Sequence, residues 1–281
     1  MNNNPVKEPI PYLRIHARTG WAPVDLRELW QHRNLLFYLV WREIRGKYAS
    51  TAFGVLWVVI SPLATALVFS LVFGFFLKVG TGTLPYPVVV FSGMCFWLYF
   101  AVSVSNGCNS MVNNAYLLSK VYFPRLIIPL IPILVGLIDL TVLLCATFAM
   151  ALFYGVTPSF SWLFLFVCVI IVMGLATGIS LWLSSLNVIY RDVSAILPVA
   201  LQIGMYLTPV VYLSSIAPKN LYYFFALNPM VGIIDSVRWA LFQNTTFPLY
   251  SLCVSLGIIL VLIISGAFYF RRIDETAADL V

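Results

Sequence analysis

Six long apolar stretches constrain this chain more than any other feature of its sequence. They lie near residues 50–77, 88–110, 126–153, 162–185, 194–213 and 249–270. A bilayer core of about 30 Å needs about 20 helical residues at about 1.5 Å rise each, so each stretch is long enough to cross it. Since 62% of the residues are hydrophobic and only 9% are charged, a soluble enzyme is excluded. The sequence predicts an all-α polytopic membrane protein with six transmembrane helices.

The basic residues predict how these spans are oriented. Thirteen of the 16 Lys and Arg residues fall on the side of the membrane that carries both termini, and three fall on the other side. Because basic loops stay inside the cell, we expect both termini in the cytoplasm of a multi-pass inner-membrane protein. Anionic headgroups explain the basic bias, and the absence of a soluble basic domain argues against nucleic acid as a partner. No signal peptide is visible, so the first span is expected to direct insertion.

A helix is expected before the first span. Asp25 can cap it, Glu28 lies at its third position, and apolar residues then recur every three or four positions up to Ile44. This pattern predicts an amphipathic helix that lies in the membrane interface. We therefore divide the chain into a cytoplasmic lead-in (residues 1–48), a six-span domain (residues 49–272) and a cytoplasmic tail (residues 273–281).

Two connecting segments are unusual. Residues 115–122 predict a short cytoplasmic helix, capped by Asn114 and rich in aromatic residues, which has no core of its own and therefore needs a protein partner. Between spans 5 and 6, two apolar halves of about 10 to 14 residues flank Asn228-Pro229. They are too short to cross the bilayer and predict an external re-entrant helical hairpin in which Asp235 and Arg238 pair.

The sequence offers little chemistry for catalysis. It contains no G-x-x-x-x-G-K-[ST] motif, so no nucleotide cofactor is expected on this chain. His16 and His32 lie far from any acidic cluster, and the five cysteines form no C-x-x-C pair, so no metal site is expected. Asp139 is the one acid in the middle of a span. It is either functional or a packed acid that bonds to a neighbouring helix.

The order and spacing of five short motifs resemble a known family. These motifs are Arg42–Tyr48, Trp57–Pro62, Phe123–Arg125, Asn187–Asp192, and Leu227–Pro229 with Arg238 downstream. From about residue 24 to residue 272 the chain resembles the membrane subunit of type-2 ABC transporters that export polysaccharides, namely the O-antigen, capsule and teichoic acid permeases.

The resemblance implies a homodimer with two copies of a separate ATPase subunit, which would bind ATP and Mg²⁺. The short helix would be the coupling helix seated in that ATPase, and the loop around Asp192 would be a second contact. The residues expected to couple to the ATPase are Asn114, Tyr116, Leu117, Leu118, Lys120, Tyr122, Phe123, Pro124, Tyr190, Arg191 and Asp192.

The substrate that the resemblance implies is a polysaccharide on a polyprenyl diphosphate. Arg42, Arg45 and Lys47 would attract the diphosphate from the inner leaflet, or are ordinary positive-inside residues. Aromatic faces stack on sugar rings, so the aromatic residues within spans are candidates for lining a channel, although contact with the core or with lipid is the simpler explanation for them. These candidates are Phe69, Phe73, Tyr206 and Tyr212.

Two other functions compete with polysaccharide export. The first is export of a small lipid, drug or haem by the same kind of transporter. The second is an intramembrane glycan transferase, which would need a cluster of acids or histidines at one membrane face, and the sequence contains no such cluster.

Overall fold

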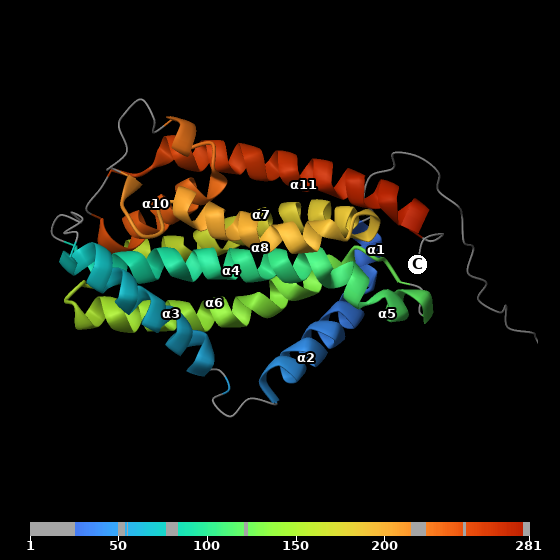
Figure 1. Ribbon diagram of the computed structural model, residues 1–281, viewed down its shortest axis with the longest axis horizontal. Helices are drawn as coiled ribbons and strands as arrows, with labels where there is room; N and C mark the ends of the chain where they lie inside the picture. Colours follow the sequence, from blue (N-terminus) through green and yellow to red (C-terminus); the bar gives the residue numbers. More distant parts are fainter. Residues whose placement is uncertain are drawn as a thin grey trace, which may run out of the picture.

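The computed structural model describes residues 26–49, 54, 56–76, 84–120, 123–214, 223–243 and 246–277. Every regular element in these ranges is helical, which confirms the predicted all-α class (Figure 1). The elements in chain order are α1 (Leu26–Gln31), α2 (Arg33–Ala49), α3 (Leu56–Phe69), the π-helical η1 (Ser70–Phe76), α4 (Tyr86–Asn113), α5 (Ala115–Lys120), α6 (Ile127–Phe153), the 3-10 helix η2 (Phe160–Leu163), α7 (Phe164–Ile189), α8 (Asp192–Leu207), α10 (Pro229–Phe242) and α11 (Leu249–Ala277).

Five of the six predicted spans are helices long and apolar enough to cross a membrane. They are α3 with η1, α4, α6, η2 with α7, and α11 up to Ile273. The chain is therefore a multi-pass membrane protein. The stretch predicted at 194–213 is instead the 16-residue α8, which ends at Leu207. Pro209 explains this end, because a proline disfavours helical geometry in the residue before it, and Thr208 is extended with ψ 141°.

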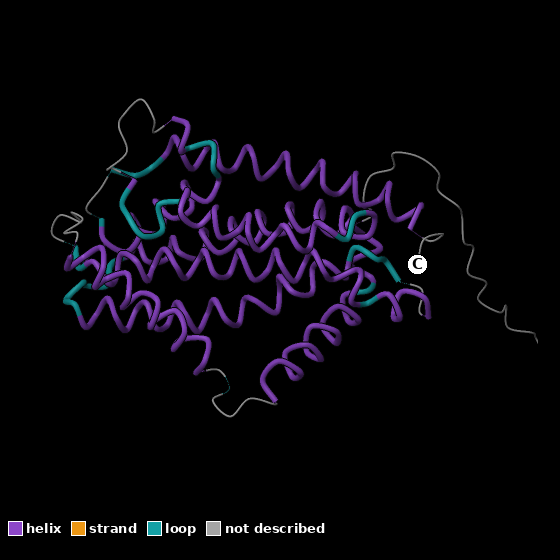
Figure 2. The backbone as a smooth tube through the Cα atoms, viewed as in Figure 1, coloured by secondary structure: helices purple, strands orange, loops and turns teal. Residues whose placement is uncertain are grey.

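The long helices pack side by side as a bundle around α4 (Figure 2). In the most apolar 18-residue stretch of α4, 78% is buried inside the protein, whereas in the corresponding stretch of α3 and η1 only 11% is buried. The main core joins α4 to α6, α7 and α10, and the outer helix α11 lies against α7. A second, smaller core surrounds Leu39, Phe123 and Phe270. It attaches α2 to α6 and α11.

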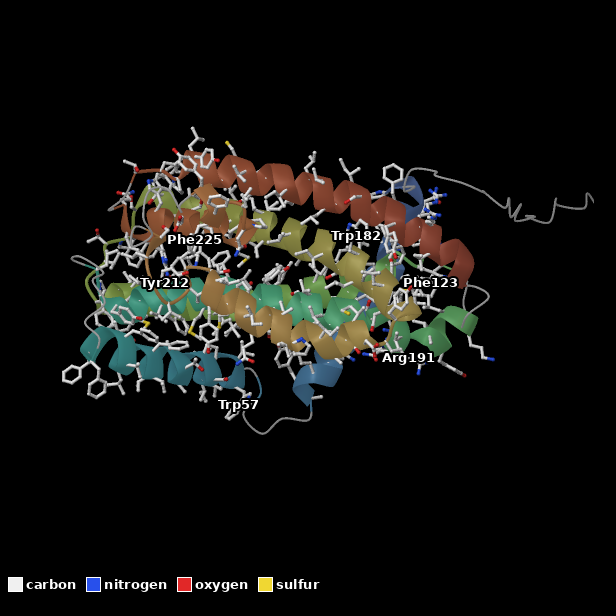
Figure 3. The ribbon with its side chains drawn as sticks, turned by 45° about the horizontal axis from the view of Figure 1, so that its top comes forward. Trp57, Phe123, Trp182, Arg191, Tyr212 and Phe225 are labelled. Carbon is white, nitrogen blue, oxygen red and sulfur yellow. The ribbon has the colours of Figure 1, made fainter. Side chains whose placement is uncertain are left out.

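The two ends of the bundle differ in what they carry. Figure 1 shows α5, the start of α2 and the end of α11 at one end, which we call the α5 end, and α10 at the opposite end. Figure 3 places Phe123 and Arg191 toward the α5 end and Tyr212 and Phe225 toward the α10 end. The predicted coupling residues Phe123 and Arg191 are therefore separated from the predicted channel residue Tyr212 by the length of the bundle.

The helix predicted before the first span is present but broken. A turn at His32 separates α1 from α2, and the predicted cap Asp25 lies outside the described residues. In α2 only Leu39 is buried, while the aromatic side chains Phe37, Tyr38 and Trp41 are exposed. Of the predicted hairpin, the second half is α10, and most of the first half lies outside the described residues.

Candidate functional site

The end of α2 is attached to the middle of α6 by a charged contact. The Lys47 ammonium forms an ion pair with the Asp139 carboxylate, and the Tyr48 hydroxyl donates a hydrogen bond to the other carboxylate oxygen. Burial, together with this hydrogen bond and the charge of Asp139, raises the pKa of Tyr48, so the phenol stays protonated and can donate. Asp139 is twelve residues beyond Ile127, roughly 18 Å along α6 at about 1.5 Å per residue. Asp139 therefore bonds to a neighbouring helix, which was one of the two interpretations from the sequence.

A cavity of about 490 Å³ lies between α2, α4 and α6, and we call it the α2 pocket. Arg42 and Lys47 contribute positive charge from α2. Asn106 and Asn113 contribute amide groups from one face of α4, since a spacing of seven residues brings side chains to the same side of a helix, and the cap residue Asn114 adds a third amide. The opposite wall is the apolar start of α6. Such a lining suits a ligand that combines negative charge with hydroxyl groups.

The three basic residues predicted to attract substrate do not all reach this pocket. Arg42 and Lys47 line it, whereas the Arg45 guanidinium lies 5.2 Å from the centroid of the Trp41 ring. Glu43 also lines the pocket, and burial raises the pKa of its carboxyl group against the opposing effect of Arg42 and Lys47. The pocket therefore places an acidic group beside its two basic ones.

At the α5 end, the predicted coupling residues differ sharply in exposure. Tyr116 is 78% exposed, and the Lys120 ammonium lies 5.8 Å from the centroid of its ring. Phe123 is only 5% exposed, because it is part of the second core, and Leu117 and Leu118 pack against that same core. The outward surface of α5 is thus formed by Tyr116 and Lys120.

The remaining predicted coupling residues lie next to α5 in the chain or in the turn between α7 and α8. Asn114 caps the end of α4 and donates a side-chain hydrogen bond to the carbonyl of Ser110 at 2.9 Å, and Pro124 is half-buried. Tyr122 lies outside the described residues. In the turn between α7 and α8, three exposed residues follow one another, namely Tyr190, Arg191 and Asp192.

The four predicted channel residues form two separate pairs. The rings of Phe69 and Phe73 lie 5.9 Å apart, and both side chains are half-buried against the main core. Tyr206 is 55% exposed on α8, and the Tyr212 hydroxyl donates a hydrogen bond to its carbonyl at 3.3 Å. The two pairs therefore lie in different parts of the chain. The first is on α3 and the adjoining η1, and the second is at the end of α8 and in the segment just after it.

Arg238 organises the α10 end in a way that the sequence did not predict. It is buried, and its two terminal nitrogens donate hydrogen bonds of 2.8 Å to the carbonyls of Tyr212 and Val210. The predicted pair with Asp235 is not among the ion pairs of the described residues; Asp235 instead accepts a hydrogen bond of 2.7 Å from Ser214. The sequence placed these two residues one turn apart, but no local pattern indicated that Arg238 would donate to the backbone that follows α8.

Two further side chains bind the same non-helical segment. Asn228 caps α10 by accepting a hydrogen bond from the Met230 amide, and it also donates one to the Thr208 hydroxyl at 2.8 Å. The Tyr86 hydroxyl donates to the carbonyl of Val211 at 2.8 Å. Residues 208–214 are therefore held by α4 and α10 together. We call this set of contacts the α10 clamp.

Within the described residues, no group of three or more His, Cys, Asp or Glu side chains could hold a metal ion. Apart from the neighbouring Asp274 and Glu275 of α11, the acids and histidines in the described ranges lie on separate elements. The geometry therefore offers binding surfaces and helix contacts, namely the α2 pocket, the exposed face of α5 and the α10 clamp.

Comparison with known proteins connects these surfaces to a family. The sequence profile of a family described as "ABC-2 type transporter" matches residues 34–242, from α2 to the end of α10. A protein named "O-antigen export system permease protein RfbA" from Klebsiella pneumoniae is 28% identical over 251 residues, which cover 88% of this chain and 95% of that protein. A protein of the same name from Myxococcus xanthus is 29% identical over 260 residues, which cover 91% of this chain and 98% of that protein.

Proposed function

The chain belongs to the ABC-2 type transporter family, and from this premise we propose that it is the permease subunit of an ATP-driven polysaccharide exporter. The cargo would be an O-antigen-like or capsular glycan on a polyprenyl diphosphate. The observation that carries the proposal is the similarity to two O-antigen export permeases along about nine-tenths of the chain. The protein would work as a homodimer in the bacterial inner membrane, with two copies of an ATPase subunit that binds ATP and Mg²⁺.

The proposed topology has six crossings with both termini in the cytoplasm. Thirteen of 16 basic residues support this orientation, with α5 on the cytoplasmic side and α10 on the external side. The fifth crossing would consist of α8 and the non-helical segment 208–214. Backbone outside helices survives at membrane depth only where its polar groups are satisfied by protein, and the α10 clamp supplies such partners for the carbonyls of Val210, Val211 and Tyr212.

ATP-driven motion would reach the membrane domain through α5 and the turn at 190–192. The exposed side chains of Tyr116 and Lys120 form the surface that an ATPase would contact. A second contact at the same end would be formed by Tyr190, Arg191 and Asp192. Because Leu117, Leu118 and Val188 all pack against the second core, a push on either contact would be passed to α2 and α6.

In this proposal the α2 pocket receives the diphosphate of the lipid carrier. Arg42 and Lys47 would bind the charge, Arg45 would guide it from the membrane surface, and the α4 amides would bind sugar hydroxyls. The glycan would then pass along an axis between two copies of the chain. Phe69, Phe73, Tyr206 and Tyr212 are the aromatic candidates for its walls.

Deleting and restoring the gene in the source bacterium tests the function. We expect deletion to leave finished lipid-linked polymer inside the cell, with none at the surface, when both pools are separated and blotted. Normal surface polymer would overturn polysaccharide export and favour a small lipid or drug as cargo. Loss of polymer without any accumulated intermediate would favour a glycan transferase.

A further inference from the structure

One residue that lines the α2 pocket, Lys47, belongs to an ion pair and is also a candidate ligand for substrate. Lys47 lines the pocket, yet its ammonium is already bound by Asp139 of α6. The Lys47 side chain is 37% exposed and that of Asp139 is 15% exposed. The exposed part of Lys47 is therefore accessible to an anion that enters the pocket, whereas the more buried Asp139 binds the Lys47 ammonium from within the protein.

The same carboxylate also fixes the last turn of α2. Tyr48 donates to Asp139, so one acid binds two consecutive residues at the helix end. The second core also anchors α2: Leu39 is 2% exposed within it, and Val40 and Ile44 pack against it. Figure 1 shows α2 running obliquely away from the bundle as it leaves the α5 end, and the Asp139 contacts join its last turn to α6. Loss of the Asp139 contact would thus free the residues of α2 that follow Ile44, while the helix up to Ile44 stays attached to the second core.

We propose that Asp139 is a positioning residue that acts as an internal competitor for anions in the α2 pocket. In the empty pocket it binds Lys47 and Tyr48 and holds the end of α2 against α6. A diphosphate group that binds Lys47 and Arg42 takes the place of the carboxylate and releases the end of α2. This inference rests on the proposed function, since it adds a control step to the same pocket.

Competition makes a prediction opposite to that of a purely structural role. If the Asp139 carboxylate competes with the ligand for Lys47, removal of the carboxylate raises the fraction of pockets that are ready to bind. The apparent affinity of the pocket for the ligand then increases. Asp139→Asn keeps the size of the side chain and removes its charge. We expect it to bind inorganic diphosphate about fivefold more tightly or better, which is the lower end of typical coupling between sites. Lys47→Met should weaken diphosphate binding.

The experiment uses the purified full chain in nanodiscs of phosphatidylcholine, titrated with inorganic diphosphate. A spin label at Gly46→Cys, in a chain with the native cysteines replaced, reports on the end of α2. Gly46 lines the pocket, and a Cβ there would meet no atom within 4 Å. Diphosphate should mobilise this label in the unsubstituted background, and Asp139→Asn should mobilise it without ligand.

Glu43→Gln is the matched control, because it removes the acidic group that lines the pocket itself and leaves Asp139 in place. If only the overall charge of the pocket matters, Glu43→Gln and Asp139→Asn should tighten diphosphate binding equally and leave the mobility of the spin label unchanged. That result would overturn the competitor role. Equal or weaker binding by folded Asp139→Asn would overturn it as well. If Asp139→Asn does not fold, Tyr48→Phe must give an intermediate gain in label mobility, and an unchanged label in that variant would contradict the proposal.

The failure of this proposal can be told apart from failure of the proposed function. Absence of diphosphate binding in every variant would remove the pocket as the diphosphate site and the competitor role with it. Export would still be decided by the gene deletion, which does not depend on Asp139.

Discussion

At the scale of single residues, Arg238 supplies hydrogen bonds to backbone that has left the helix. The carbonyls of Val210 and Tyr212 lie in the segment that follows Pro209, where helical partners are no longer present. A planar guanidinium can serve two acceptors at once, whereas the lysine ammonium is a single point of charge. The arginine side chain therefore suits this site through its shape as well as its charge.

We expect Arg238→Lys to destabilise the protein by roughly 1 to 3 kcal/mol, because a buried carbonyl loses its donor. Thermal unfolding in detergent would measure the change. Arg191→Lys is the matched control, since Arg191 is exposed in the turn before α8. Equal unfolding temperatures for the two variants would mean that the α10 clamp contributes little to stability.

Phe123 and Tyr116 illustrate how two residues with the same predicted role can differ physically. Phe123 is 5% exposed and Tyr116 is 78% exposed. Phe123→Ala should lower the free energy of unfolding by roughly 3 to 5 kcal/mol through the cavity that it leaves in the second core.

Tyr116→Ala should leave the free energy of unfolding unchanged but lower export in cells and uncouple export from ATP hydrolysis. Full export by the Tyr116 variant would argue against α5 as the coupling helix.

At the scale of elements, the sequence predicted the long helices well and their contacts poorly. The bounds expected for α4, α6 and α11 lie within about four residues of the observed membrane spans, because long apolar runs directly report helices buried in lipid or protein. The end of α8 was missed, although Pro209 was a visible signal for it. The contact between Lys47 and Asp139 joins residues that are 92 positions apart, and no local pattern encodes such a pairing.

The crossing of α10 and α11 depends on a close approach at Gly232. A Cβ on this residue would lie 2.5 Å from the Ser251 carbonyl oxygen and 2.3 Å from the Ser255 hydroxyl. Gly232→Ala should therefore destabilise the protein by roughly 1 to 3 kcal/mol through overpacking. At Gly257 of α11 a Cβ would meet nothing within 4 Å, so Gly257→Ala should be neutral or stabilising by up to about 1 kcal/mol. Thermal unfolding of both variants tests the contrast, and similar losses would contradict it.

At the scale of the whole molecule, burial within one chain is uneven. The helix α4 is largely enclosed, whereas α3 with η1 exposes most of its apolar surface. On α8 the exposed side chains include Ile196, Val199 and Ile203. A helix that is apolar on its outer side must face lipid or another protein chain. These two elements are therefore where the proposed homodimer would add its contacts.

The orientation of the whole molecule can be tested at the two ends of α7. The basic-residue count predicts that Arg191, after α7, faces the cytoplasm and that Thr157, before η2, faces outward. Both residues are exposed, so Arg191→Cys and Thr157→Cys, each in a background without native cysteines, should accept a thiol reagent from water. In intact spheroplasts, a membrane-impermeant maleimide should label Thr157→Cys alone, and permeabilisation should add labelling of Arg191→Cys. The reverse pattern would invert the topology and would put α5 on the side where no ATPase can reach it.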